Sequence, residues 1–166
     1  MSLEKFQLPS ALLTELYKDS LVVLESNQIT NKSLEKQGLH SLGKNNKKIL
    51  ILVSHENAVH LPDEELNFLM GILTACKLTM ADIALLNTFN DPGINYQSLQ
   101  KAFKPATLIC FGIDLSTLSF PLEFPHYQLQ KYNKQVFLSA PSLKKLSEDV
   151  TEKKQLWACL KTLFTL

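Results

Sequence analysis

The sequence predicts an α/β protein with a single domain, in which a short and mostly parallel sheet lies between helices. The chain has 166 residues and a hydrophobic content of 45%, which is enough to bury one sizeable core without cross-links. Its continuous aliphatic segments are typical of strands that are covered on both faces, as in a parallel sheet. These segments alternate with helical patterns, and this order favours right-handed crossovers between parallel strands.

The clearest strand is the aliphatic segment of residues 48–54, which shows no alternation with polar residues. Because such a segment must be covered on both faces, we expect residues 49–53 at the centre of the sheet. A helix should follow from Pro62, since the acidic residues after it complement the positive end of the helix dipole. The buried stripe of this helix is predicted to consist of Leu66, Leu69, Met70 and Leu73.

The rest of the core region repeats the alternation of strand and helix. We expect strands over residues 81–87, 106–111, 127–132 and 135–139, and a helix over 96–103. At Gly112, directly after the third strand, the backbone must turn sharply or let another group approach closely. The last helix should begin with a capping box that runs from Asp149 to Glu152.

Residues 1–46 are predicted to form an N-terminal region ahead of the α/β core at 47–166, within one domain overall. A short helix fits residues 8–17, because Pro9 suits a first turn and the leucines share one face. A brief β-prone segment at 20–24 follows it. Residues 25–48 are polar, and we expect a long loop there.

The composition excludes several classes of protein. Cys76, Cys110 and Cys159 are far apart within apolar segments, which favours reduced core thiols in a cytoplasmic protein over a disulfide or zinc site. No apolar segment reaches the length of about 20 residues that spans a bilayer, so no membrane association is expected. The net charge is +1 and arginine is absent, so a nucleic-acid surface would have to be built from lysine alone.

Polar side chains follow the predicted central strand. Ser54, His55, Glu56 and Asn57 stand where ligands bind in open α/β sheets, outside the carboxyl end of a strand. A general base or a water-positioning group could be formed there, but no second catalytic group can be placed opposite it. An ordinary polar loop between strand and helix explains the same residues. Neither a metal site nor a cofactor is expected, since His55 and His60 have no third ligand nearby and the common nucleotide-binding motifs are missing.

Lysines occur in groups along the chain. The groups are Lys44, Lys47 and Lys48, then Lys144 and Lys145, then Lys153 and Lys154. Such groups can face phosphates, but with acidic residues between them and a net charge near zero they are more often an ordinary solvated surface.

The order of elements from residue 48 onward resembles the uracil-DNA glycosylase fold, a three-layer α/β/α arrangement. The most specific segment is 135–143, QVFLSAPSL, which is similar to the glycosylase strand that ends in His-Pro-Ser-Pro and leads into a DNA-contacting loop. The resemblance implies a ligand or DNA loop formed by Ser54, Gly112, Pro141, Ser142, Lys144 and Lys145. However, Ala140 stands at the position of the catalytic histidine, and the loop after the first strand lacks the water-activating aspartate motif.

One non-enzymatic family with that fold, the psi subunit of the bacterial DNA polymerase III holoenzyme, is similar to this chain over nearly its full length. The likeness lies in residues 12–16 and 21–24, the strand 49–53, and a tail in which Ala140-Pro141-Ser142-Leu143 precedes Leu156-Trp157. It implies a bridging protein of a replication or repair assembly, with an α/β body that binds a second accessory subunit. Contact with nucleic acid would be weak or indirect.

The same resemblance implies that residues 1–19 dock on the clamp-loader collar. The apolar anchors of this arm would be Phe6, Leu8, Leu12, Leu13 and Leu16. An amphipathic stripe of this kind would look the same if the helix packed on its own domain. The rival from another functional class is an active or relic DNA-processing enzyme that uses His55 with Glu56 or Asn57, and a third alternative is an unrelated α/β scaffold.

Overall fold

The computed structural model describes residues 39–120 and 122–166, which belong to one compact unit, Gly38–Leu166. The predicted helix at 8–17, the β-prone segment at 20–24 and the docking arm at 1–19 lie outside the described residues. Of the polar segment at 25–48, the structure describes only the last part. There, a short strand takes the place of the expected loop.

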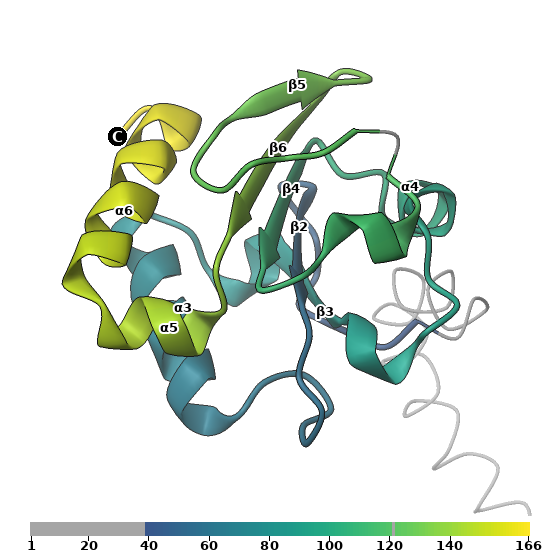
Figure 1. The fold of residues 1–166 in the computed structure, drawn as a ribbon, viewed down its shortest axis with the longest axis horizontal. Coiled ribbons are helices and arrows are strands. Elements are labelled where there is room, and N and C mark those ends of the chain that lie inside the picture. Colours follow the sequence, from purple (N-terminus) through teal and green to yellow (C-terminus); the bar gives the residue numbers. More distant parts are fainter. Residues whose placement is uncertain (1–38, 121) are drawn as a thin grey trace, which may run out of the picture. The chain divides into compact units, whose positions relative to one another are not determined.

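The described unit is built around a mixed sheet of six strands in the order β1-β3-β2-β4-β6-β5 (Figure 1). The four inner strands are parallel to one another, and the edge strands β1 and β5 pair in antiparallel fashion. The strands are β1 (Ser41–Leu42), β2 (Ile49–Val53), β3 (Ile83–Asn87), β4 (Thr107–Phe111), β5 (Gln130–Tyr132) and β6 (Gln135–Ala140). The prediction of an α/β protein with a mostly parallel sheet is confirmed.

Strand β2 lies inside the sheet, as its composition predicts. It pairs with β3 on one side and with β4 on the other, and all five of its residues are buried. Ile49, Ile51 and Val53 belong to a core cluster that they share with the helices on one face. Leu50 and Leu52, which alternate with them, are fully buried toward the opposite face. Because neither face of this strand meets solvent, polar residues do not alternate with the apolar ones, and the sequence is continuously aliphatic.

Helices cover both faces of the sheet, consistent with a three-layer arrangement (Figure 1). One face carries α3, α5 and α6, whose leucines complete the core cluster, while α4 lies on the other side. The helices are α3 (Asp63–Ala75), α4 (Tyr96–Phe103), α5 (Leu143–Glu148) and α6 (Val150–Phe164). Three single turns of 3-10 helix add to them, η1 (Met80–Asp82), η2 (Thr88–Asn90) and η3 (Leu115–Leu118).

Several local features differ from the sequence-based expectations. Met70 of α3 is 45% exposed, because Leu69 and Leu73 fill the core side of the helix and Met70 is turned away from it. Helix α5 is not expected from the sequence, and the Ser142 side chain caps it by accepting from the Lys145 backbone N–H. Asp149 does cap α6. In the predicted capping box, the Glu152 side chain would also accept from the backbone N–H of Asp149. The Glu152 carboxylate instead contacts Tyr127 and Lys145.

Candidate functional site

The predicted ligand residues gather at the carboxyl edge of the parallel strands. From β2 the chain proceeds to β3 on one side, and from β4 it proceeds to β6 on the other. The crevice between the ends of β2 and β4 is therefore the topological switch point, where ligands bind in open α/β sheets. Val53 and Phe111 are register partners there, so Ser54 and Gly112 follow side by side. Pro141 and Ser142 leave the neighbouring strand β6 at the same edge.

The loops that follow β4 and β6 touch each other at Gly112. Gly112 has a φ of +63°, and a Cβ atom built on it would lie 2.9 Å from both Cα and Cβ of Ser142. Its backbone N–H donates to the carbonyl of Ala140 at 2.9 Å. The close approach that a glycine permits is thus made by the turn after β6, and the two loops are packed together.

The loop after β2 is held in place by one buried side chain, Asn87 at the end of β3. Its Oδ1 accepts from the backbone N–H of His55 at 2.9 Å and of Phe89 at 3.2 Å. Its Nδ2 donates to the carbonyls of His55 and Ala58, both at 2.8 Å. All the hydrogen-bonding capacity of the amide is used on the main chain, so Asn87 shapes this loop and has no group free for a ligand.

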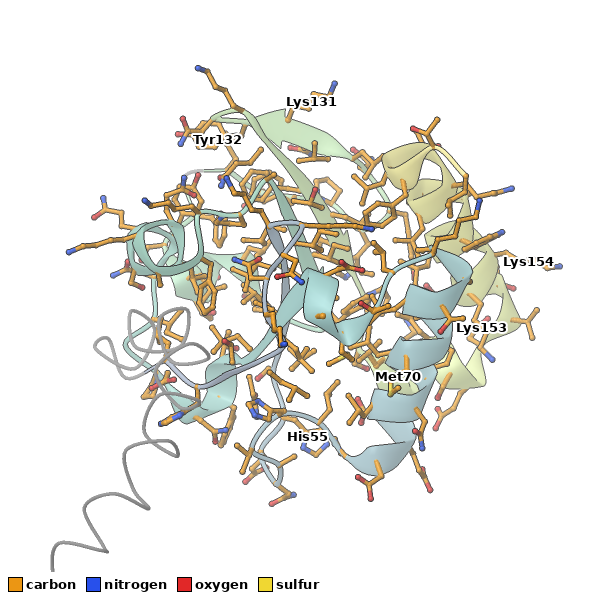
Figure 2. The ribbon with its side chains drawn as sticks, turned by 180° about the vertical axis from the view of Figure 1, so that it is seen from behind. His55, Met70, Lys131, Tyr132, Lys153 and Lys154 are labelled. Atoms are coloured by element: carbon orange, nitrogen blue, oxygen red, sulfur yellow. The ribbon has the colours of Figure 1, made fainter. Side chains whose placement is uncertain are left out.

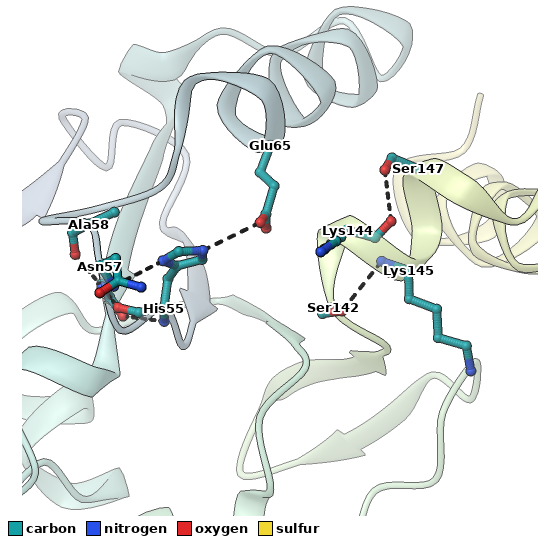
Figure 3. A network of polar contacts seen from close by, with 9 residues as sticks. His55, Asn57, Ala58, Glu65, Ser142, Lys144, Lys145 and Ser147 are labelled. Atoms are coloured by element: carbon teal, nitrogen blue, oxygen red, sulfur yellow. Dashed lines mark hydrogen bonds and ion pairs between the residues drawn. The ribbon is translucent and has the colours of Figure 1, made fainter.

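Both ring nitrogens of His55 have partners within the protein, as Figure 3 shows. Nδ1 accepts from the backbone N–H of Asn57 at 3.3 Å, and Nε2 faces Oε1 of Glu65 at 3.6 Å. A ring nitrogen that already accepts a backbone N–H has no lone pair left to take a proton from a ligand. Glu56 and Asn57 are exposed. This arrangement fits a polar connecting loop, and a general base would first have to break the contact with Asn57.

The two lysines after β6 also lie at the carboxyl edge. Lys145 forms an ion pair with Glu152, with Nζ 3.4 Å from Oε1. The other carboxylate oxygen of Glu152 accepts from the hydroxyl of Tyr127. Burial, followed by this contact with Glu152, raises the pKa of Tyr127 well above its usual range. Lys144 is exposed, and its carbonyl accepts from the hydroxyl of Ser147 (Figure 3).

A hollow of about 800 Å³ opens beyond the ends of β4 and β6. Its polar lining includes Asp114, His126 and Ser139, and the Oγ of Ser139 lies 3.0 Å from Nδ1 of His126. A serine next to a histidine can form a nucleophile and its base, but no described residue orients the ring from its other nitrogen. His126 and Ser139 are also joined by a parallel backbone bridge, and Tyr127 N–H donates to the Ser139 carbonyl. The pair therefore fastens this loop to β6.

Sequence reasoning missed both Asn87 and the contact between His126 and Ser139. An asparagine at the end of a buried strand, followed by a turn, is the signal that could have identified Asn87. No spacing signal exists for His126 and Ser139, because the contact forms only when the loop that carries His126 folds back onto β6. The sequence-predicted residues Phe6, Leu8, Leu12, Leu13 and Leu16 lie outside the described residues.

The described part of the chain contains no group of three or more histidine, cysteine or carboxylate residues that could hold a metal ion. Cys76 and Cys110 are buried, and burial raises the pKa of both thiols. Within residues 39–120 and 122–166, none of the helices has the length and apolar character needed to cross a membrane. No protein-family model and no curated protein matches this sequence.

Proposed function

We propose that this chain is a non-catalytic accessory protein of DNA replication that resembles the psi subunit of DNA polymerase III. In this proposal its fold is of the uracil-DNA glycosylase type, and its body bridges two protein partners. The parallel order β3-β2-β4-β6 between two helical layers is compatible with that fold. The similarity of the tail, residues 140–157, to the psi family adds to it.

The proposal rests mainly on which side chains and loop contacts are found at the carboxyl edge of the sheet. Ala140, which stands where the glycosylases place a catalytic histidine, is fully buried and has no titratable group. The ring of His55 is engaged by Asn57 and Glu65. The turn after β6 packs on the loop after β4, with Ser142 against Gly112. At the positions where the glycosylases carry their catalytic groups, a flipped base would find neither the acid nor the base of that family, which favours a fold that has kept its scaffold without its chemistry.

A second observation favours a protein-binding role. A groove of about 420 Å³ runs between α3 and α6, and its walls are formed mainly by apolar side chains, among them Phe68, Ile72 and Trp157. Trp157 remains 36% exposed, and Figure 2 shows Lys153 on the neighbouring turn of α6. Lys153 lies over the ring of Phe68, 5.6 Å from its centroid, and covers one wall. An accessible apolar surface rimmed by polar residues is typical of protein interfaces.

The direct test is reconstitution with clamp-loader subunits from the same organism. Purified full-length protein is mixed with the assembled clamp loader, and the complex is measured by size-exclusion chromatography with light scattering and by calorimetry. We expect a stoichiometric complex at micromolar concentration or below. If the two elute separately at all concentrations tested, the proposal is wrong.

A second assay tests the enzymatic rival. The full-length protein is incubated with uracil-containing single-stranded and duplex DNA, and strand cleavage after alkali reports base excision. We expect none above the background of an identically purified Asn57→Ala variant. Excision that disappears on Glu56→Gln or Asn57→Ala would establish an enzyme instead.

A further inference from the structure

The near-neutral net charge conceals a strong separation of charges between the two edges of the sheet. Each helix that connects two strands runs antiparallel to them. The ends of these helices and the segments that precede the strands therefore lie at the edge of the sheet where the parallel strands begin, which we call the amino edge. Lysines dominate that edge: Lys44, Lys47, Lys48, Lys77, Lys101, Lys104, Lys131, Lys134 and Lys161. Among the described residues there, Asp82 is the one acid, and it pairs with Lys47 at 3.7 Å.

The opposite edge is acidic. Its loops and helix starts hold Glu56, Asp63, Glu64, Glu65, Asp91, Asp114, Glu123, Glu148, Asp149 and Glu152. The lysines nearby, Lys144, Lys145, Lys153 and Lys154, are fewer, and Lys145 is paired with Glu152. Figure 2 shows the two ends of the molecule, with Lys131 at one and His55 at the other. A polyanion is therefore attracted to the amino edge and repelled from much of the carboxyl edge.

Backbone hydrogen bonds fix the lysine-bearing segments of the amino edge relative to one another. The carbonyl of Lys48 accepts from the N–H groups of Ala106 and Thr107, and the carbonyl of Ala106 accepts from Val136. The segments that precede β2, β4 and β6 are joined in this way. The Lys47 N–H donates to the Asp82 carbonyl at 3.0 Å, which secures the loop before β2 over the start of β3. The lysines thus stand on a rigid base.

Several of these lysines occupy positions where glycine is the usual residue. Lys48, Lys77, Lys104 and Lys134 have φ values between +44° and +61°. Lys104 is the left-handed cap of α4, and Lys134 is the second residue of a two-residue hairpin turn after Asn133, where Asn-Gly is the common pair. A favourable contact with the helix dipole accounts for lysine after a helix, but not for Lys48 or Lys134. Strained backbone at charged positions points to a role for the charge.

We propose that the amino edge binds the sugar–phosphate backbone of single-stranded nucleic acid. The lysine-bearing segments of β3, β2, β4, β6 and β5 stand in a row across four strand spacings, about 19 Å. A single row of this kind follows one phosphate chain. Because the chain has no arginine, every one of these contacts would come from a lysine ammonium, which meets a phosphate as a point charge.

An aromatic side chain completes the edge at its β5 end. Tyr132 is 36% exposed, directly after Lys131 (Figure 2), and its ring packs on Tyr96 with centroids 6.4 Å apart. A supported, half-exposed ring beside a lysine row can stack on a base without reading its identity. This inference does not depend on which protein partners the body binds.

The test uses fluorescence anisotropy of a labelled oligothymidylate of about 15 nucleotides, a length that single-strand binders commonly cover. The full-length protein is compared with the triple variant Lys48→Gly, Lys104→Gly, Lys134→Gly. Because these three positions are left-handed, glycine removes the charge and also relieves the backbone, so the melting temperature should hold or rise. We expect affinity at low salt to fall at least about tenfold, and the slope of log K against log salt to fall by about 2 in magnitude.

A second variant, Lys44→Gln, Lys101→Gln, Lys131→Gln, removes charge from the same edge without touching left-handed positions, and it should lose affinity similarly. The rival surface is tested by Lys144→Gln, Lys145→Gln, Lys154→Gln, which should change affinity less than twofold. Equal losses from both edges, losses from the rival edge only, or no binding by the unaltered protein would overturn the proposal. Equal affinity for duplex DNA would also overturn it, because a duplex requires a different geometry. Equal affinity for polyglutamate would do the same, because it would indicate an acidic protein as the partner.

Discussion

Asn87 hydrogen-bonds the main chain of His55 in both directions. Its Oδ1 accepts from the His55 N–H at 2.9 Å, and its Nδ2 donates to the His55 carbonyl at 2.8 Å. The two residues are far apart in sequence and leave neighbouring parallel strands. Although Asn87 stands at the edge where ligands bind in open α/β sheets, its side chain is a structural link that gives the loop after β2 a defined shape.

Asn87→Ala should destabilise the domain, because it leaves the His55 N–H and the His55 and Ala58 carbonyls without partners. We expect a loss of about 1–3 kcal/mol in the free energy of unfolding, measured by urea denaturation. Asn57→Ala in the same loop is the matched control, and its exposed side chain should make a difference within about 0.5 kcal/mol. Equal effects of the two substitutions would show that Asn87 has no special role in holding the loop.

Two glycines should respond to alanine in opposite ways. Gly112 has a positive φ and lies against Ser142, so Gly112→Ala should destabilise by more than about 1 kcal/mol. Gly71 lies in α3 with no atom within 4 Å of a Cβ built on it. Gly71→Ala should therefore stabilise by about 0.5–1 kcal/mol, since alanine has less conformational entropy to lose. Thermal unfolding of both variants measures this, and a stabilising Gly112→Ala would mean that the two loops are not packed as described.

Replacing a central aliphatic side chain tests the place of β2. Ile51 is about 1% exposed and pairs with Leu85 on one side and Ile109 on the other. Ile51→Ala should cost about 2–5 kcal/mol through lost burial and a cavity. Val150→Ala, at an exposed apolar residue, serves as the control and should change stability little. An unchanged denaturation midpoint for Ile51→Ala would contradict a central strand.

Stability should fall as the pH drops below neutrality, in part through His60. Burial, and then the charge of His40, lowers the pKa of His60 below its usual 6.5. The unfolded chain therefore takes up a proton at higher pH than the folded protein, so this contribution is present above pH 6.5 and is lost below it. His60→Gln should reduce the fall in melting temperature between neutral and mildly acidic pH, and His40→Gln should reduce it less. A pH profile unchanged in both variants would exclude this origin.

Most of the core elements could be predicted from the sequence because each has a local cause. The continuous aliphatic run of residues 49–53 requires burial on both faces, and the acidic residues after Pro62 mark the start of α3. Helix α5 could not be predicted in this way, because it has only six residues and depends on the Ser142 cap and on packing against α3 and α6. The exposure of Met70 likewise depends on tertiary packing.

The position of the candidate site could be predicted from the sequence, but the contacts between its loops could not. Chain order places Ser54, Gly112 and Ser142 at one edge once the strands are parallel. That Ser142 would pack on Gly112, and that Asn57 would engage the ring of His55, depends on how the loops fold. The separation of charge between the edges was hidden for another reason: lysine groups that are distant in sequence meet only when the sheet is assembled.

The measurement that tests the central claim most directly is binding of the clamp loader by the full chain and by a chain without residues 1–19, with the melting temperature of each recorded in parallel. We predict that the full chain binds, and that the deletion abolishes binding while the melting temperature changes little. A full-length Leu12→Asp, Leu13→Asp, Leu16→Asp variant should behave like the deletion, while Thr14→Asp should bind normally. Failure of the full chain to bind, or a deletion that unfolds the domain, would contradict a replication accessory protein with an N-terminal docking arm.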